Sequence, residues 1–367
     1  MVALFLVAIL LWTSYLPPSG PATSYPSPPP PSNDVELLTN SSLSRGLSLL
    51  RPRCYRNLSM VNITGFSTLP ERIQDFLYYQ HCRHFPLLLD LPHKCGGEVF
   101  LLLVIKSSPG NYERRQVLRE TWAEERLHMG TWIRRVFISG TTGAGFEKER
   151  MNQLMEVEHR KHGDILQWDF QESFINLTLK QVLFLEWQQG RCPHVRFLLN
   201  GDDDVFAHTD NMVHYLQSTH GKLGGDKHLF VGTIMEGSEP IRNPSKYFVP
   251  VQVYESTTYP PYCSGGGYLL SGYTSKVLHQ MSKYVPLQPI DDAYMGMCLA
   301  RAGLKPSNHI GVKSGGLRIP SLKVDHYDPC YYKDILMSHR FLPHELYLLW
   351  SQVKDPRLRC WSKSTEP

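Results

Sequence analysis

From about residue 97 onward, short apolar runs of strand length alternate with longer segments of helical character. The first run, 99–106 (VFLLLVIK), is apolar at consecutive positions, which is typical of a strand that is covered on both faces of a sheet. Further strands are predicted at 132–139, 164–170 and 195–199, with helices at 114–122, 146–162 and 177–189. This alternation predicts an α/β fold with a mostly parallel sheet and helices on both faces, whose ligands bind beyond the carboxyl ends of the strands.

The first fifty residues have a different pattern. Positions 2–16 are almost wholly apolar, no Lys or Arg precedes Arg45, and eight prolines follow between positions 17 and 31. We interpret the apolar run as a membrane anchor, with a cleaved signal peptide as the alternative. The predicted organisation is a signal-anchor segment, a Pro-rich stem, an N-terminal packing segment and a catalytic domain, at residues 1–16, 17–50, 51–96 and 97–360.

Composition narrows the class of protein. The 38 basic and 34 acidic side chains give a formal charge of +4 and form no basic tract, so nucleic acid is not an expected partner. Hydrophobic residues make up 42% of the chain, enough for a large core. The eight cysteines form no CxxC pair, which argues against zinc ribbons, and the sequence does not determine their pairing. Together with the apolar N-terminus, four glycosylation sequons indicate the secretory pathway; they lie at Asn40, Asn57, Asn62 and Asn176.

Three consecutive carboxylates, Asp202, Asp203 and Asp204, follow directly after the predicted strand at 195–199. Such groups repel one another unless a positive charge compensates, and a divalent cation that bridges carboxylates to a phosphate would provide that charge. The alternatives are a solvated acidic turn or a calcium loop, although the spacing of an EF-hand is absent. We expect a site for a metal and a diphosphate here.

A second acidic pair, Asp291 and Asp292, stands at the start of a helix that is predicted to end at Gly303. In a structural interpretation, Asp291 caps the helix and Asp292 only favours the positive end of the helix dipole. In a catalytic interpretation, the same dipole keeps a carboxylate ionised, as a general base at neutral pH requires. The pattern alone does not separate the two interpretations.

A run of glycines at Gly265, Gly266 and Gly267 follows Tyr262 and precedes an apolar segment. Consecutive glycines allow the backbone to approach a ligand closely, and a tyrosine offers a flat face on which a sugar can stack. A flexible linker is the alternative, but the apolar segment that follows favours a binding site.

Basic residues follow the first predicted strand. Arg114, Arg115 and Arg119 lie on the helix at 114–122, near the expected position of a nucleotide, and a solvated basic face is the alternative. Among the 16 histidines, His309 is the candidate metal ligand, although a lone histidine is more often structural.

Taken together, these motifs resemble those of the β1,3-glycosyltransferases of glycosyltransferase family 31. The matching stretches are RRQVLRETW at 114–122, DDDVF at 202–206, YPPYCSGGGYLLS at 259–271 and IDDAYMGMCL at 290–299, and the resemblance spans about residues 97–360. Within the family, segments 163–187, 197–213 and 339–350 look most like β1,3-N-acetylglucosaminyltransferases, in particular those that extend core 1 O-glycans. The galactosyl-transferring branch is the rival.

The resemblance implies a GT-A fold and a type II Golgi membrane protein that uses a UDP-sugar and Mn²⁺, with Mg²⁺ as the alternative ion. It also implies that Asp204 holds the metal, with Asp202 and Asp203 assisting or contacting the ribose, and that Asp292 is the catalytic base beside Asp291. Gly265–Gly267 would line the sugar site, and His309 would be the extra metal ligand.

The predicted reaction is the inverting transfer of N-acetylglucosamine from UDP-GlcNAc to the 3-hydroxyl of a terminal β-galactose on glycoprotein glycans. Its acceptors would be core 1 O-glycans or poly-N-acetyllactosamine chains, and further copies of the chain or other Golgi transferases are conceivable partners. The alternatives are a β1,3-galactosyltransferase that uses UDP-galactose and an inactive, secreted carbohydrate-binding protein. The enzymatic interpretation requires that the two acidic clusters face each other across one cavity.

Overall fold

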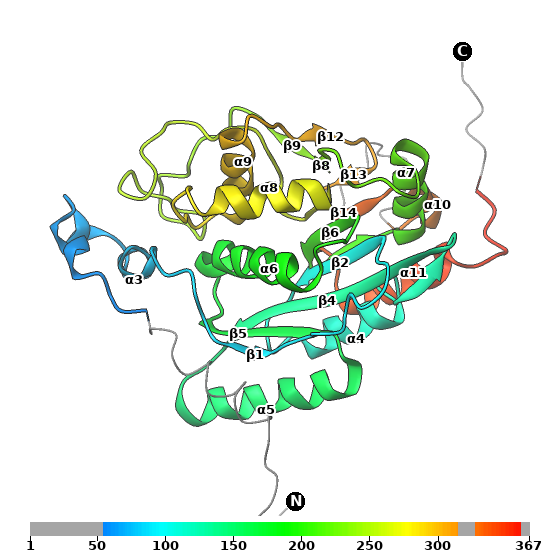
Figure 1. Ribbon diagram of the computed structural model, residues 1–367, viewed down its shortest axis with the longest axis horizontal. Helices are drawn as coiled ribbons and strands as arrows, with labels where there is room; N and C mark the ends of the chain where they lie inside the picture. The colour runs from blue at the N-terminus through cyan, green and yellow to red at the C-terminus, as the bar shows by residue number, and fades with distance from the viewer. Residues whose placement is uncertain (1–53, 315–326, 361–367) are drawn as a thin grey trace, which may run out of the picture. The chain divides into compact units, whose positions relative to one another are not determined.

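The computed structural model describes residues 54–314 and 327–360, which form an α/β fold as predicted (Figure 1). In spatial order, the main sheet contains β1 (Leu87–Leu89), β5 (Ile165–Gln171), β4 (Thr131–Thr141), β2 (Leu101–Lys106), β6 (Phe197–Asp202), β11 (Gly267–Ser271), β8 (Phe230–Gly232) and β12 (Ser307–Asn308). β3 (Arg126–His128) pairs with β4 outside this order. The four central strands β5, β4, β2 and β6 are parallel, and β11 is antiparallel to both of its neighbours.

The predicted elements are confirmed. The four predicted strands are β2, β4, β5 and β6, and the helices between them are α4 (Tyr112–Glu120), α5 (Gly145–His162) and α6 (Leu177–Arg191). Two small sheets were not predicted from the sequence. One pairs β9 (Ile234–Met235) with β10 (Tyr262–Cys263), and the other joins β13 (Val312–Lys313), β14 (Met337–His339) and β7 (Val205–Ala207).

Strand β2 shows why the first apolar run is continuous. Its side chains alternate between two cores, because successive residues of a strand point to opposite faces of the sheet. Leu101, Leu103 and Ile105 belong to the core between the sheet and helices α4, α5 and α11 (Pro343–Val353). Leu102 and Val104 belong to the core between the opposite face of the sheet and helices α6, α8 (Gly272–Ser282) and α9 (Asp291–Arg301). Figure 1 shows α6, α8 and α9 above the sheet and α4 and α5 below it. Helices therefore cover both faces, as predicted.

Residues 54–96 pack against this body. They contain η2 (Leu58–Asn62), η3 (Phe66–Thr68), α3 (Glu71–Tyr79) and the edge strand β1. Phe66, Leu69, Ile73 and Leu77 form a small core that also contacts Phe248 and Val253 of a distant loop. The remaining elements are η4 (Phe174–Asn176), α7 (Thr209–His220) and α10 (Pro329–Asp334).

Three disulfides fix the pairing that the sequence left open: Cys54–Cys82, Cys95–Cys192 and Cys330–Cys360. Cys263 and Cys298 are free and buried. Of the predicted glycosylation sites, Asn62 is exposed and Asn57 and Asn176 are half-buried. The predicted anchor at 1–16, the stem at 17–50 and Asn40 lie outside the described residues. Within the described part of the chain, no helix combines the length and the apolar character needed to cross a membrane.

Candidate active site

A cavity of about 860 Å³ opens where β2 and β6 end. Both acidic clusters line it, together with Tyr262, Gly265 and Gly266. The requirement that the two clusters share one cavity is therefore confirmed. The location is the one that parallel α/β sheets favour for ligands, because the carboxyl ends of neighbouring strands meet at one edge.

The acidic triplet starts on the last residue of β6 and continues into the turn before β7. Asp202 and Asp204 converge on a histidine that the sequence did not single out, His339 of β14. His339 Nε2 lies 3.0 Å from Asp204 Oδ1 and 3.7 Å from Asp202 Oδ2. The convergence follows from strand pairing, since His339 is paired with Val205, the residue after Asp204.

The donor set of Asp202, Asp204 and His339 fits a divalent transition-metal ion. One ligand atom from each residue lies within 4.8 Å of the others. Asp204 Oδ1 is buried, and the imidazole of His339 lies beside it at 3.0 Å. Burial opposes ionisation, but the neighbouring imidazole of His339 holds the pKa of Asp204 below its ordinary value. Two carboxylates and an imidazole suit Mn²⁺ better than Mg²⁺, which prefers oxygen ligands alone.

His309 does not belong to this group, so the structure does not bring the histidine predicted as the extra metal ligand to the acidic triplet. Its ring packs edge-to-face against Tyr215, and its Nδ1 accepts a hydrogen bond from the backbone N–H of Gly311. Burial lowers the pKa of His309, as expected of a structural imidazole. No sequence signal favoured His339, because its role depends on the pairing of β14 with β7.

Asp203 points away from the metal-ligand group toward the end of β2. Its Oδ2 accepts hydrogen bonds of 2.8 Å from Ser107 Oγ and from Asn111 Nδ2, and Arg114 Nε lies 3.9 Å from Oδ1. Burial raises the pKa of Asp203 despite these donors. Asp203, Ser107 and Asn111 all line the cavity.

Lys106, the last residue of β2, connects the two acidic clusters. Its Nζ lies 2.9 Å from Asp202 Oδ1 and 2.9 Å from Asp291 Oδ2, and the lysine side chain is only 4% exposed. Burial works against the charge, but the two carboxylates raise the pKa of Lys106 well above its ordinary value. The sequence offered one hint: a lysine that ends an otherwise apolar strand.

Asp291 and Asp292 begin α9, but neither is the N-cap, which is Ile290. The capping interpretation of Asp291 is therefore wrong, since its carboxylate binds Lys106 instead. Burial and the adjacent Asp291 raise the pKa of Asp292 to about 7. The helix terminus acts in the opposite direction: Asp292 Oδ1 accepts a hydrogen bond of 2.9 Å from the backbone N–H of Ala293, which lowers the pKa of Asp292, but burial outweighs this effect.

The glycine run lets the backbone pass close to both clusters. A Cβ atom on Gly265 would stand 3.0 Å from Asp292 Oδ2, and one on Gly266 would stand 2.8 Å from the His339 ring. At Gly267 a Cβ would stand 2.7 Å from Met337 Sδ. Any side chain at Gly266 or Gly267 would push the loop away from β14.

None of the three predicted arginines is among the residues that line the cavity. Arg115 and Arg119 are 1% and 8% exposed, and both form ion pairs of 2.7 Å with Glu158 of α5. Arg119 also pairs with Asp164 at 2.8 Å. Arg114 is nearer to the site, although its Nη1 donates to the carbonyl of Phe341. Direct substrate contact by Arg115 and Arg119 therefore has no support in the geometry.

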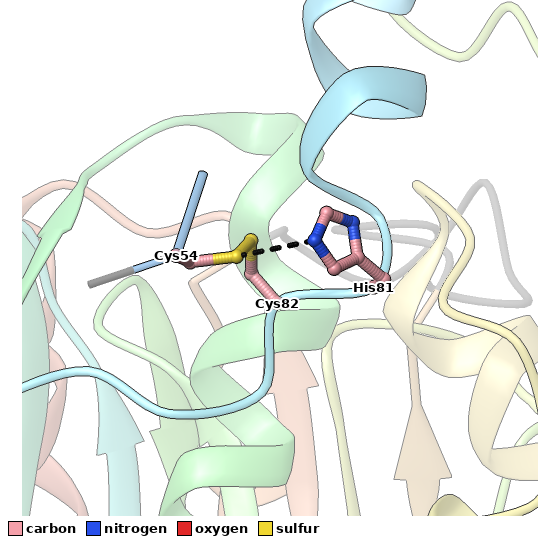
Figure 2. A group of neighbouring side chains, drawn as sticks. All are labelled: Cys54, His81 and Cys82. Carbon is pink, nitrogen blue, oxygen red and sulfur yellow. Dashed lines mark hydrogen bonds between the residues drawn. A yellow bond between two sulfur atoms is a disulfide. The ribbon is translucent and has the colours of Figure 1, made fainter. Parts of the chain in front are cut away.

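A second group of potential metal ligands is Cys54, His81 and Cys82. Figure 2 shows the two sulfurs bonded to each other, with His81 Nε2 3.5 Å from Cys54 Sγ. Neither cysteine has a thiolate to offer, so the disulfide removes this group from consideration as a metal site.

Comparisons with known proteins found similar sequences and more distant structures. The model of a protein family described as galactosyltransferase matches residues 113–309. A human N-acetyllactosaminide β-1,3-N-acetylglucosaminyltransferase 3 is 52% identical over 313 residues, 85% of this chain and 83% of that protein. A human acetylgalactosaminyl-O-glycosyl-glycoprotein β-1,3-N-acetylglucosaminyltransferase is 52% identical over 314 residues, 84% of this chain and 81% of that protein. A solved galactosyltransferase, LgtC with donor and acceptor sugar analogs, is more distant: 12% identity, a TM-score of 0.34, and coverage of 68% of this chain and 95% of that one.

Proposed function

Because this chain belongs to the galactosyltransferase family and is a glycosyltransferase, we propose that it transfers N-acetylglucosamine from UDP-GlcNAc to the 3-hydroxyl of a terminal β-galactose. The names of the two human relatives, which specify β-1,3-N-acetylglucosaminyl transfer, support this donor and linkage. Glycoprotein glycans are the proposed acceptors. The observation that carries the proposal is the single cavity in which Asp292 faces the group formed by Asp202, Asp204 and His339.

Asp292 is the proposed general base. Its carboxylate accepts the proton of the acceptor's 3-hydroxyl while that oxygen attacks the anomeric carbon from the face opposite UDP, which inverts the configuration. A base with a pKa near the working pH combines a useful fraction of the ionised form with sufficient basicity, and the pKa of about 7 meets this condition. The absent side chain of Gly265 leaves Asp292 Oδ2 accessible.

Asp202, Asp204 and His339 are the proposed ligands of a Mn²⁺ ion. When bound, such an ion offsets the charge that develops on the departing diphosphate. Asp203, held by Ser107 and Asn111, is the proposed contact for the nucleoside. Lys106 binds both Asp202 and Asp291, so it fixes the position of the proposed metal ligands relative to the proposed base, Asp292.

We also propose a Golgi location with a type II membrane anchor. Three disulfides indicate an oxidising compartment, because such bonds rarely persist in the cytosol. The four sequons and the apolar residues near the N-terminus agree with this proposal.

A donor-by-acceptor screen tests the function. The full-length chain is incubated with UDP-GlcNAc or UDP-galactose, with a β-galactoside acceptor, and with Mn²⁺ or EDTA. We expect GlcNAc transfer that requires the metal. Preferential transfer of galactose would favour the β1,3-galactosyltransferase alternative, and transfer that resists EDTA would contradict the metal site.

A further inference from the structure

Aromatic side chains line a part of the cavity that the reaction described above does not use. Phe174 of η4 and Tyr247 pack edge-to-face with ring centroids 5.2 Å apart. Lys246 Nζ lies 4.7 Å from the centroid of Tyr247 and 5.5 Å from that of Phe174. All three residues line the cavity, and Tyr247 is still 39% exposed. A partly exposed ring on a cavity wall offers a face for a ligand.

This aromatic wall lies apart from the metal-ligand group. Lys246 and Tyr247 belong to the loop between β9 and β10, which Figure 1 shows on the side of α3, away from β14 and its His339. The same loop contributes Glu239 and Ile241 to the cavity. Within the described residues, neither Lys246 nor Glu239 forms an ion pair, so both keep their hydrogen-bonding capacity for a ligand.

The loop is held in place from two sides. Arg242 donates from Nη1 to the carbonyl of Val249 at 2.7 Å and from Nη2 to that of Tyr254 at 2.9 Å. The guanidinium of Arg72 in α3 donates to the carbonyl of Ser245, next to Lys246. Phe248 packs into the small core of the N-terminal segment. The aromatic wall is therefore largely preformed, which lowers the entropic cost of binding.

The direction of attack places the acceptor on this side. In an inverting transfer the acceptor oxygen approaches opposite to the leaving UDP, so the terminal galactose lies at Asp292, beyond the sugar of the donor. The sugars that precede the galactose must leave the base on the side away from the metal-ligand group. Phe174 and Tyr247 line the cavity, and the loop that carries Tyr247 lies on the side of α3, away from β14 (Figure 1).

We propose that Phe174, Lys246 and Tyr247 form a subsite for the second sugar of the acceptor. The apolar face of that pyranose stacks on the Tyr247 ring, and Lys246 and Glu239 bond to its hydroxyls. This inference rests on the proposed function. Its consequence is that the enzyme prefers acceptors of at least two sugars over a single galactoside.

The test compares KM values for methyl β-galactoside and for N-acetyllactosamine at saturating UDP-GlcNAc, with the full-length chain. We expect Tyr247→Ala to raise the KM for the disaccharide about fivefold and to leave the KM for the monosaccharide unchanged. The factor of about five is the loss of affinity expected when one aromatic stacking contact is removed. Tyr247→Phe should behave like the wild type, because the ring and not the hydroxyl stacks.

Tyr284→Ala is the matched control, since Tyr284 is also an exposed tyrosine with a cation over its ring, the guanidinium of Arg301 at 5.4 Å, and does not line the cavity. Its KM values should equal those of the wild type. The subsite is refuted if Tyr247→Ala leaves the disaccharide KM unchanged, or if it raises both KM values equally. A wild type that transfers GlcNAc to neither acceptor refutes the proposed function itself, and the subsite with it.

Discussion

Replacing Lys106 with methionine tests whether one buried cation holds the two acidic clusters together. Methionine keeps much of the length and volume of the side chain but removes its charge. Asp202 and Asp291, each 2.9 Å from Nζ in the native protein, would then face each other without compensation.

The expected loss of stability follows from these distances. Two unit charges 2.9 Å apart interact by roughly 6 kcal/mol at an effective dielectric constant of 20. The desolvation of the buried lysine offsets part of this attraction. Removal of one member of a buried ion pair typically lowers the free energy of unfolding by about 3–5 kcal/mol. For a domain of this size we therefore expect the Lys106→Met variant to melt roughly 10 °C below the wild type.

The same change should shift the pH dependence of activity. The positive charge of Lys106 lowers the pKa of Asp292, whose value of about 7 is set by burial and by Asp291. Without Lys106 the pKa of Asp292 rises, so the base stays protonated up to a higher pH. In a profile of kcat/KM against pH, the acidic limb should move to higher pH, and activity at pH 7 should fall more than activity at pH 9.

Lys180→Met is the control for a lost buried lysine. Lys180 is 1% exposed and forms an ion pair of 2.7 Å with Glu172 on the wall of the same cavity, and in the part of the chain that the structure describes it forms no ion pair with either acidic cluster. The Lys180→Met variant should lose a comparable amount of stability, and the acidic limb of its kcat/KM profile should stay at the pH of the wild type. Equal profiles for the two variants would show that Lys106 does not tune the base, and our reasoning would be wrong.

Four further substitutions test the other roles. Asp292→Asn should lower kcat by about 10²–10⁴-fold at an unchanged melting temperature, and wild-type turnover would remove Asp292 as the base. His339→Ala should weaken Mn²⁺ binding measured by calorimetry, whereas His309→Ala should not; the reverse result would restore the assignment made from the sequence. Arg115→Met should destabilise the fold by about 3 kcal/mol, because Glu158 loses one of its two buried partners, and an unchanged melting temperature would contradict that role.

The sequence predicted what depends on local pattern. The continuous apolar run of β2 and the helical periods around it gave the parallel core of the sheet, and the position of Asp202–Asp204 after a strand placed them at its ligand-binding edge. The second cluster could be predicted as a helix start, but its partner could not. The contact between Asp291 and Lys106 joins residues 185 positions apart, and no local pattern records it.

The features of the site that the sequence did not predict have a common physical cause. No local sequence pattern distinguishes His339 from His309. The pairing of β14 with β7 brings His339 to Asp204. The raised pKa of Asp292 could not be predicted from the sequence for a related reason. A helix terminus is visible in the sequence, whereas the burial that outweighs it is a property of the assembled fold.

The arginine motif shows how a residue can matter to a site that it does not touch. Arg115 binds Glu158 of α5 and donates from Nη1 to Ser107 Oγ at 3.1 Å. The hydroxyl of Ser107 in turn donates to Asp203 Oδ2 at 2.8 Å. Since a hydroxyl has a single proton, the hydrogen bond accepted from Arg115 directs that proton toward Asp203. The arginine is therefore a positioning residue, which reconciles its place in a recognisable motif with a side chain that is 1% exposed.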